Sequence, residues 1–293
     1  MSSIHPTACV DDKAQLGRDV EIGPHCYIGP DVVIGDDCRL YNNVTVVGAT
    51  RLGRNNELFP GVVLGTPPQD IKYHGGRTEL IVGDDNIFRE HVTAHPGTEV
   101  GGAVTRIGNH NRFLVGVHIA HDVDLGSHCI LANGVQIAGH CHIEDCVTMG
   151  GMVGVHHFCT AGRHCFVAGL TRVTVDVPPF MIFAGEPARV RGINANGMSR
   201  WDFGEQSLQN LRQAFKLLFS RRAITDEPNN LLKRISQLES NGPLDDNLRY
   251  LITFIRRSIS DGVYGRYLES QRHDTTEDRS GFYNQQLLEK PQP

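Results

Sequence analysis

Imidazole and carboxylate side chains stand next to each other in the string His118-Ile119-Ala120-His121-Asp122. Imidazole titrates near pH 6.5, so a neutral histidine can take a proton from a hydroxyl group at neutral pH. A neighbouring carboxylate can orient the ring and stabilise the imidazolium that results. The string therefore indicates general-base chemistry.

Histidines are concentrated in one part of the chain. Of the fifteen in the sequence, eight gather in its middle: His95, His118, His121, His140, His142, His156, His157 and His164. His121 and His140 are 19 residues apart, and His140 and His156 are 16 apart. A structural repeat of about 18 residues would stack these three along one edge and make a candidate site there.

The elements that must position these side chains follow a six-residue repeat. Aliphatic residues occupy every sixth position at the start of the chain: Ile4, Val10, Leu16, Ile22, Ile28, Ile34, Leu40, Val46, Leu52, Leu58 and Leu64. The phase breaks at 66–80 and near 96–105, and apolar residues otherwise continue it: Val82, Phe88, Ala94, Ile107, Phe113, Ile119, Leu125, Leu131, Ile137, Ile143, Met149, Val155, Ala161, Val167 and Val173. A period of six fits neither a helix nor simple strand alternation.

This period is typical of the hexapeptide β-helix, in which each segment is a short strand and a turn with one inward aliphatic side chain. Three segments close a triangular coil, so the 26 positions predict about nine coils. We therefore expect a mainly β domain, a parallel β-helix, over residues 1–190. Loop insertions are expected near 66–80 and 96–105.

The pattern changes near residue 190. Apolar residues then recur at helical spacing in three sets: Leu208, Leu211, Phe215 and Leu218; Leu231, Leu232, Ile235 and Leu238; and Leu248, Leu251, Ile252 and Ile255. Residues 191–260 are therefore predicted to form a small α-helical domain. Residues 261–293 are polar, which predicts a disordered tail.

Composition limits the classes of protein and partner. No run of about 18 apolar residues exists, so no membrane span is expected. The N-terminus lacks the features of a signal peptide, which predicts a cytoplasmic protein with its eight cysteines as free thiols. Residues 189–260 carry 12 Lys and Arg against 7 Asp and Glu, a surplus that could attract an acidic partner. Few aromatics accompany these charges, so nucleic acid is not expected.

Several strings resemble those of the UDP-N-acetylglucosamine O-acyltransferase family. They are His118-Ile-Ala-His-Asp122, Ile130-Leu-Ala-Asn133, Ala138-Gly-His140, Gly150-Gly-Met-Val-Gly-Val-His156, Gln69-Asp-Ile-Lys-Tyr73, Val92-Thr-Ala-His-Pro-Gly-Thr98, Asp176-Val-Pro-Pro179 and Gly192-Ile-Asn194. The similarity runs in order over about residues 4–258 and leaves only the tail outside. It implies left-handed coils, no cofactor, and a homotrimer whose active sites lie between neighbouring subunits.

The resemblance also implies roles for individual residues. His121 is the implied general base, Asp122 its orienting partner, and the backbone N–H of Gly139 a donor to the oxyanion. The implied substrate-binding residues are Asp70, Lys72, His95, His118, His140, His156, Asn194 and Arg200. Gly169 matches the position that limits acyl length, and a glycine there leaves room for a long chain. No metal ligand is implied.

The implied reaction moves an (R)-3-hydroxyacyl group from acyl carrier protein to the glucosamine 3-OH of UDP-N-acetylglucosamine, the first step of lipid A synthesis. His121 would deprotonate that hydroxyl as it attacks the thioester, without a covalent intermediate. The acidic carrier protein is expected to bind the basic helical region, which contains Arg212, Lys216, Arg221 and Arg222.

Three positions depart from the family, and all are expected where the nucleotide binds: His157 replaces Gln, Asn196 replaces Glu, and Trp201 replaces Arg. Other functions stay open. One is acyl transfer to a 3-amino analogue of the sugar. Another is a metal-dependent hydratase of the carbonic anhydrase type, with zinc at His140-Cys-His142 and His156-His-Phe-Cys159. The third is a β-helix scaffold without catalytic activity.

Overall fold

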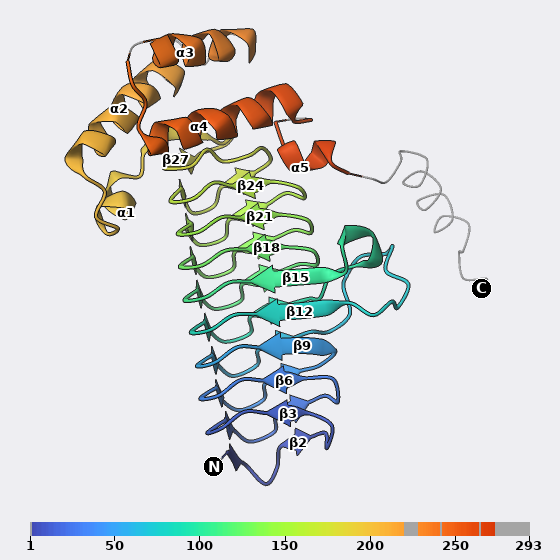
Figure 1. Ribbon diagram of the computed structural model, residues 1–293. Helices are drawn as coiled ribbons and strands as arrows, with labels where there is room; N and C mark the ends of the chain where they lie inside the picture. The colour runs from blue at the N-terminus through green and yellow to red at the C-terminus, as the bar shows by residue number, and fades with distance from the viewer. Residues whose placement is uncertain (1, 220–227, 241, 264, 273–293) are drawn as a thin grey trace.

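Short parallel strands wind into a triangular prism with helices at its C-terminal end (Figure 1). The coordinates are a computed structural model that describes residues 2–219, 228–240, 242–263 and 265–272. Most strands are only two residues long, and each pairs in parallel with the equivalent strand of the next coil. The expected architecture, a left-handed parallel β-helix followed by a small α-helical domain, is confirmed.

The three faces of the prism are three sheets. Sheet A contains β1 (Ser3–Ile4), β4 (Glu21–Ile22), β7 (Arg39–Leu40), β10 (Glu57–Leu58), β13 (Ile87–Phe88), β16 (Arg112–Phe113), β19 (Ile130–Leu131), β22 (Thr148–Met149), β25 (Phe166–Val167), β27 (Met181–Ala184) and the antiparallel β28 (Arg189–Ile193). Sheet B contains β2 (Cys9–Val10), β5 (Tyr27–Ile28), β8 (Thr45–Val46), β11 (Val63–Leu64), β14 (Thr93–Ala94), β17 (His118–Ile119), β20 (Gln136–Ile137), β23 (Gly154–Val155) and β26 (Arg172–Val173). Sheet C contains β3 (Gln15–Leu16), β6 (Val33–Ile34), β9 (Ala49–Leu52), β12 (Glu79–Val82), β15 (Val104–Ile107), β18 (Asp124–Leu125), β21 (His142–Ile143) and β24 (Thr160–Ala161). The chain visits the faces in the order A, B, C, so each coil is three strands long.

Aliphatic side chains at every sixth position fill the prism, as predicted. From Ile22 to Val173 all of these positions are buried. Ile4 is 45% exposed, because no coil lies beneath the first one to cover it. Cysteines occupy further inward positions, and Cys141 and Cys159 are buried in this core. Burial of apolar area on this scale is the main stabilisation of such a coil.

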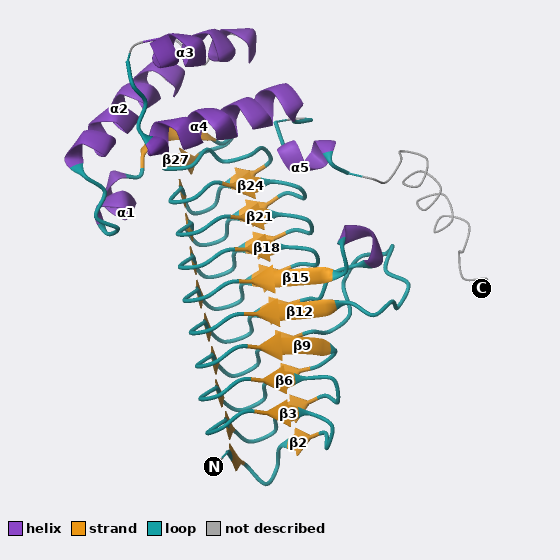
Figure 2. Cartoon of the chain, in the orientation of Figure 1, coloured by secondary structure: helices purple, strands orange, loops and turns teal. Residues whose placement is uncertain are grey.

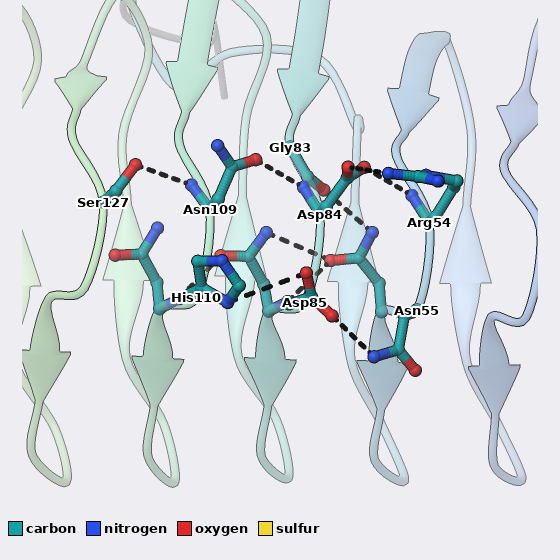
Figure 3. A network of polar contacts seen from close by, with 11 residues as sticks. Arg54, Asn55, Gly83, Asp84, Asp85, Asn109, His110 and Ser127 are labelled. Atoms are coloured by element: carbon teal, nitrogen blue, oxygen red, sulfur yellow. Dashed lines mark hydrogen bonds and ion pairs between the residues drawn. The ribbon is translucent and has the colours of Figure 1, made fainter.

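Polar side chains at the edge between sheets C and A form hydrogen bonds from one coil to the next. Figure 3 shows Arg54 paired with Asp84, at 3.1 Å, and the backbone N–H of Asp84 donating to the Asn109 side chain at 2.7 Å. Asn109 in turn donates its backbone N–H to the Ser127 hydroxyl at 3.0 Å. Backbone N–H groups in the turns, which have no partner within the sheets, thereby donate to side chains of the next coil.

Two insertions interrupt the strands, one between β11 and β12 and one between β14 and β15 (Figure 2). The second contains the short 3₁₀ helix η1 (Glu99–Gly101). The Glu99 carboxylate accepts hydrogen bonds from the backbone N–H groups of Gly76, at 2.6 Å, and His74, at 3.3 Å. This carboxylate therefore ties the two insertions into one unit beside the prism.

The helical domain consists of α1 (Ala195–Ser199), α2 (Glu205–Phe219), α3 (Pro228–Ser240) and α4 (Asp246–Arg256). The apolar faces predicted from the sequence are the buried ones, and they pack on Phe180 and Met181 beside the last coil. None of the described helices is long and apolar enough to cross a membrane.

The sequence placed the start of the tail too early. Residues 257–263 and 265–272 are folded, with the π-helix η2 (Arg257–Asp261) and the short helix α5 (Tyr267–Ser270). Contacts with the β-helix hold this segment, and a polar composition does not reveal such contacts. Residues 273–293 of the predicted tail lie outside the described residues, as do Arg221 and Arg222.

Candidate active site

The candidate catalytic residues lie on the edge between sheets B and C, in two neighbouring columns with a spacing of 18. One column contains His121, Gly139 and His157, and the next contains Asp122, His140 and Phe158. The rings of His121 and His140 lie 5.0 Å apart, as their spacing suggested. His156 belongs to neither column, because it directly follows β23, but it lines the same hollow.

His121 is oriented by a single strong contact. Its Nδ1 lies 2.8 Å from Oδ2 of Asp122. Because an ionised carboxylate only accepts hydrogen bonds, Nδ1 carries the proton and Nε2 keeps a free electron pair. The ring is 9% exposed and lines the hollow, so this basic nitrogen is available to a substrate hydroxyl there.

The Asp122 carboxylate is fixed by residues that the sequence did not single out. Thr98 donates its backbone N–H to Oδ1 at 2.8 Å and its hydroxyl to Oδ2 at 2.6 Å. Burial alone would raise the pKa of Asp122, but the hydrogen bonds from His121 and Thr98 outweigh it and lower that pKa. The second insertion, which carries Thr98, thus keeps Asp122 ionised beneath the base.

Gly139 lies directly against the base. A Cβ at this position would overlap the His121 ring, so the close approach requires glycine. No hydrogen-bond acceptor among the described residues takes the Gly139 N–H. A backbone N–H without a partner, on a residue in contact with the base, is a donor of the kind that can stabilise an oxyanion.

An open hollow of about 430 Å³ lies beside the base, over the outer face of sheet B. Its lining residues are Gln69, His118, Ala120, His121, Gln136, Ile137, Ala138, Gly139, Gly154, Val155, His156, His157 and Arg172. Gln136 and Arg172 were not predicted as site residues. They point outward from strands whose sequence pattern reveals only the inward positions.

Burial keeps the neighbouring imidazoles neutral. It lowers the pKa of both His118 and His140 to about 4, and the nearby His95 and His121 add to the effect at His118. The pKa of His157 is also lowered, chiefly by burial and secondly by His156. At neutral pH these rings are uncharged, so each can both donate and accept a hydrogen bond.

The depressed values predict how stability depends on pH. Unfolded His118 and His140 have a pKa near 6.5, so between pH 6.5 and 4 the unfolded chain binds more protons than the folded one. The free energy of unfolding should therefore fall as pH falls through this window, measured as the urea midpoint. His118→Asn should flatten the fall. His142→Asn is the control and should make the fall steeper, since a hydrogen bond to Asp124 raises the pKa of His142 and its protonation stabilises the folded state.

The first insertion brings Asp70 to the base. Its Oδ2 lies 3.9 Å from Nε2 of His121, and the Asp70 side chain is 15% exposed. Lys72 is two residues further along the same loop, and its backbone N–H donates to Asp70. His95 holds the loop itself, because its Nδ1 lies 3.0 Å and 2.9 Å from the carbonyl oxygens of Thr66 and Pro67.

Asn194 and Arg200 lie on a different face of the prism. They line a second hollow of about 260 Å³ over sheet A, together with His128, Ile130, Cys146, Thr148, His164, Gly197 and Trp201. Asn194 also caps α1, accepting from the Gly197 N–H at 3.1 Å. One chain therefore does not bring these two residues to His121.

The departures from the family are divided between the two hollows. His157 lines the hollow over sheet B, and Trp201 lines the one over sheet A, where its ring lies 4.9 Å from that of His128. Asn196 lies on α1 beside the second hollow. Gly169 lies at the edge between sheets A and B, next to Leu170, whose side chain is 83% exposed.

The strings that suggested zinc do not converge on one point. Cys141 is buried and donates to the carbonyl oxygen of His156 at 3.1 Å, while His142 faces outward and pairs with Asp124 at 3.2 Å. A different set, Asp70, His121 and His140, has ligand atoms within 4.8 Å of one another. A metal there would occupy Nε2 of His121, since Nδ1 is bound to Asp122, and would remove the base.

Comparisons with known proteins identify the family. Family models described as "Udp N-acetylglucosamine O-acyltransferase; Domain 2" and "Bacterial transferase hexapeptide (six repeats)" match residues 176–263 and 13–48. An acyl-[acyl-carrier-protein]--UDP-N-acetylglucosamine O-acyltransferase of Anaeromyxobacter sp. (strain Fw109-5) is 41% identical over 254 residues, which cover 87% of this chain and 96% of that relative. The chain belongs to the UDP-N-acetylglucosamine O-acyltransferase family.

Solved structures of the UDP-N-acetylglucosamine O-acyltransferase family match along most of their length. LpxA from Acinetobacter baumannii is 41% identical with a TM-score of 0.79, covering 85% of this chain and 95% of that one. LpxA from Bacteroides fragilis is 33% identical with a TM-score of 0.81, over 86% and 96%. The Arabidopsis enzyme is 31% identical with a TM-score of 0.79, over 90% and 99%.

Proposed function

We propose that this protein transfers an (R)-3-hydroxyacyl group from acyl carrier protein to the 3-OH of UDP-N-acetylglucosamine, as the first step of lipid A synthesis in the cytoplasm. The observation that carries the proposal is the His121–Asp122 pair, with Nε2 facing the hollow beside a glycine N–H. The relatives, which are named acyl-[acyl-carrier-protein]--UDP-N-acetylglucosamine O-acyltransferases, support it. No metal or other cofactor takes part.

The reaction follows from the position of the base. The 3-OH gives its proton to Nε2 of His121 as its oxygen attacks the thioester carbonyl. The oxyanion of the tetrahedral intermediate accepts a hydrogen bond from Gly139 N–H. When the intermediate collapses, the carbon–sulfur bond breaks and the carrier thiolate takes the proton from His121. Asp122 stabilises the transient imidazolium.

Substrate contacts are assigned by position. Asp70, Lys72, His118, His140 and His156 hold the sugar, the diphosphate or the acyl chain beside the base. His95 acts through the loop that it anchors. The exposed Lys216 and the neighbouring Arg212 on α2 meet the acidic carrier protein.

The nucleotide is bound between subunits of a homotrimer. Asn194 and Arg200 belong to the hollow over sheet A, and His121 to the hollow over sheet B. In a threefold ring of prisms, sheet A of one chain faces sheet B of the next, so the two hollows form one site. The exposed Met152 and Leu170, at the edge between these sheets, would be covered in such a ring.

A shared site predicts complementation between inactive variants. His121→Ala and Arg200→Ala each disable every site of a homotrimer. Trimers that contain both chains should regain about a third of wild-type kcat/KM, because one of the three sites in each mixed ring combines the two intact halves. Activity is measured after the two differently tagged chains are purified together. If verified mixed trimers stay inactive, the site lies within one chain.

Acyl transfer to two acceptors tests the proposed reaction. The wild-type protein is assayed with UDP-N-acetylglucosamine and its 3-amino analogue, using 3-hydroxyacyl carrier proteins of several lengths. We expect the hydroxyl acceptor and a long chain to be preferred, since Gly169 has no side chain to shorten the acyl site. Preference for the 3-amino analogue would mean that the natural acceptor group is an amine and not a hydroxyl. No transfer by a folded trimer, with stoichiometric zinc in the protein, would favour the hydratase.

A further inference from the structure

The last part of the chain that the structure describes, residues 257–263 and 265–272, turns back from the helical domain to the β-helix. It follows α4 as η2, forms a short bridge between Val263 and Arg266, and continues into α5. Figure 1 shows α5 beside the last coils, below the end of α4. The family model ends at residue 263, so α5 and Arg272 belong to a part of the chain that it does not cover.

A single buried carboxylate docks this segment. Oδ2 of Asp176 accepts hydrogen bonds from the Ser258 hydroxyl, at 2.8 Å, and from the Tyr267 backbone N–H, at 2.9 Å. The backbone N–H of Asp176 donates to the Gly265 carbonyl at 2.8 Å. Asp176 is only 6% exposed, so these contacts are shielded from water and hold the segment in one place.

The docking point lies in the same column as the catalytic carboxylate. Asp122, His140, Phe158 and Asp176 follow one another at intervals of 18 along the edge between sheets B and C. The His140 and Phe158 rings are stacked, with centroids 4.6 Å apart and planes inclined by 3°. Nδ1 of His140 lies 3.8 Å from Oδ2 of Asp122.

Arg272 completes this column from the docked segment. Its guanidinium carbon lies 4.9 Å from the centroid of Phe158, and its side chain is 22% exposed. Glu269 forms ion pairs with both arginines, with its carboxylate 3.5 Å from Arg272 and 3.1 Å from Arg266. A continuous series of contacts therefore runs from Arg272 through Phe158 and His140 to the catalytic Asp122.

We propose that Arg272 is a positioning residue of the active site, which holds the Phe158 ring and thereby fixes the His140 imidazole for sugar binding. The segment 257–272 is then part of the active site. The proposal rests on the proposed function only through the role of His140 as a sugar-binding residue. Attraction between a guanidinium and an aromatic face is worth about 0.5–2 kcal/mol.

A double-mutant cycle tests the route through Phe158. Arg272→Ala should raise the KM for UDP-N-acetylglucosamine about 3- to 10-fold, while kcat and the KM for the acyl carrier protein change less. Phe158→Leu should do the same, and the double variant should be no worse than Phe158→Leu alone. Arg272→Lys, which keeps the cation, should recover part of the loss. Arg249→Ala is the control, because Arg249 forms a solvent-exposed pair with Asp246 on α4 and its loss should change neither constant.

Two results would overturn the proposal. One is an unchanged KM in Arg272→Ala, and the other is losses that multiply in the double variant, which would mean that Arg272 does not act through Phe158. A second readout needs no activity. In wild type, NMR of isotope-labelled histidine should show His140 shifted by the ring current of Phe158, and Arg272→Ala should weaken that shift. If the shift persists in Arg272→Ala, the His140–Phe158 stack does not depend on Arg272 and the proposal is wrong. This result does not depend on which sugar is the acceptor.

Discussion

Replacing His121 by alanine should lower kcat by about 10²–10⁴-fold, the usual contribution of a positioned general base. In the proposed reaction Nε2 accepts the proton of the attacking hydroxyl, and Oδ2 of Asp70 lies 3.9 Å from this nitrogen. A carboxylate is a much weaker base than an imidazole and does not replace it near neutral pH. KM should change much less, because the other contacts to substrate remain.

The chain contains a matched control for this variant. His142 pairs with Asp124 at 3.2 Å, just as His121 pairs with Asp122, but it lies on the outer face of sheet C, away from the hollow. His142→Ala removes the same side chain and should leave kcat within about twofold. Acyl transfer is measured at saturating substrates, with the trimer checked by sedimentation. If His121→Ala kept more than about a tenth of wild-type kcat, another group would be the base.

The fold could be predicted because its signal is distributed over the whole chain. Every coil must bury one side chain per segment, so the six-residue period appears 26 times and a few exceptions do not obscure it. The helices α2, α3 and α4 of the small domain were predictable for the same reason, since each has an apolar stripe that repeats at helical spacing.

The candidate site was only partly predictable, because contacts between coils depend on exact register. The histidine spacings of 19 and 16 suggested one edge, whereas the structure divides these residues among columns with a spacing of 18. Thr98 could not be identified as the anchor of Asp122, since the length of an insertion does not reveal where its residues return. Arg272 was assigned to a disordered tail for a similar reason: Asp176, which docks its segment, is 96 positions earlier in the sequence.

Asp122→Asn should lower kcat almost as much as loss of the base, although it only replaces one carboxylate oxygen by an NH₂ group. The carboxylate oxygens have fixed partners: Oδ1 accepts the backbone N–H of Thr98, and Oδ2 accepts the Nδ1 proton of His121. A backbone N–H can only donate, so the amide oxygen of asparagine must face Thr98. Its NH₂ group then faces Nδ1 of His121. The opposite orientation would set two buried donors against each other, at a cost of about 1–3 kcal/mol.

An NH₂ group facing Nδ1 selects the wrong tautomer of the base. Nδ1 must then accept, the ring proton moves to Nε2, and Nε2 can no longer take the proton of the 3-OH. We expect kcat to fall about 10²–10⁴-fold at every pH from 6 to 9, since a neutral ring in this tautomer does not lose its Nε2 proton in that range. Asp124→Asn makes the same change in the His142 pair and should leave kcat intact. A loss of less than about tenfold in Asp122→Asn would mean that the carboxylate does not set the tautomer of His121.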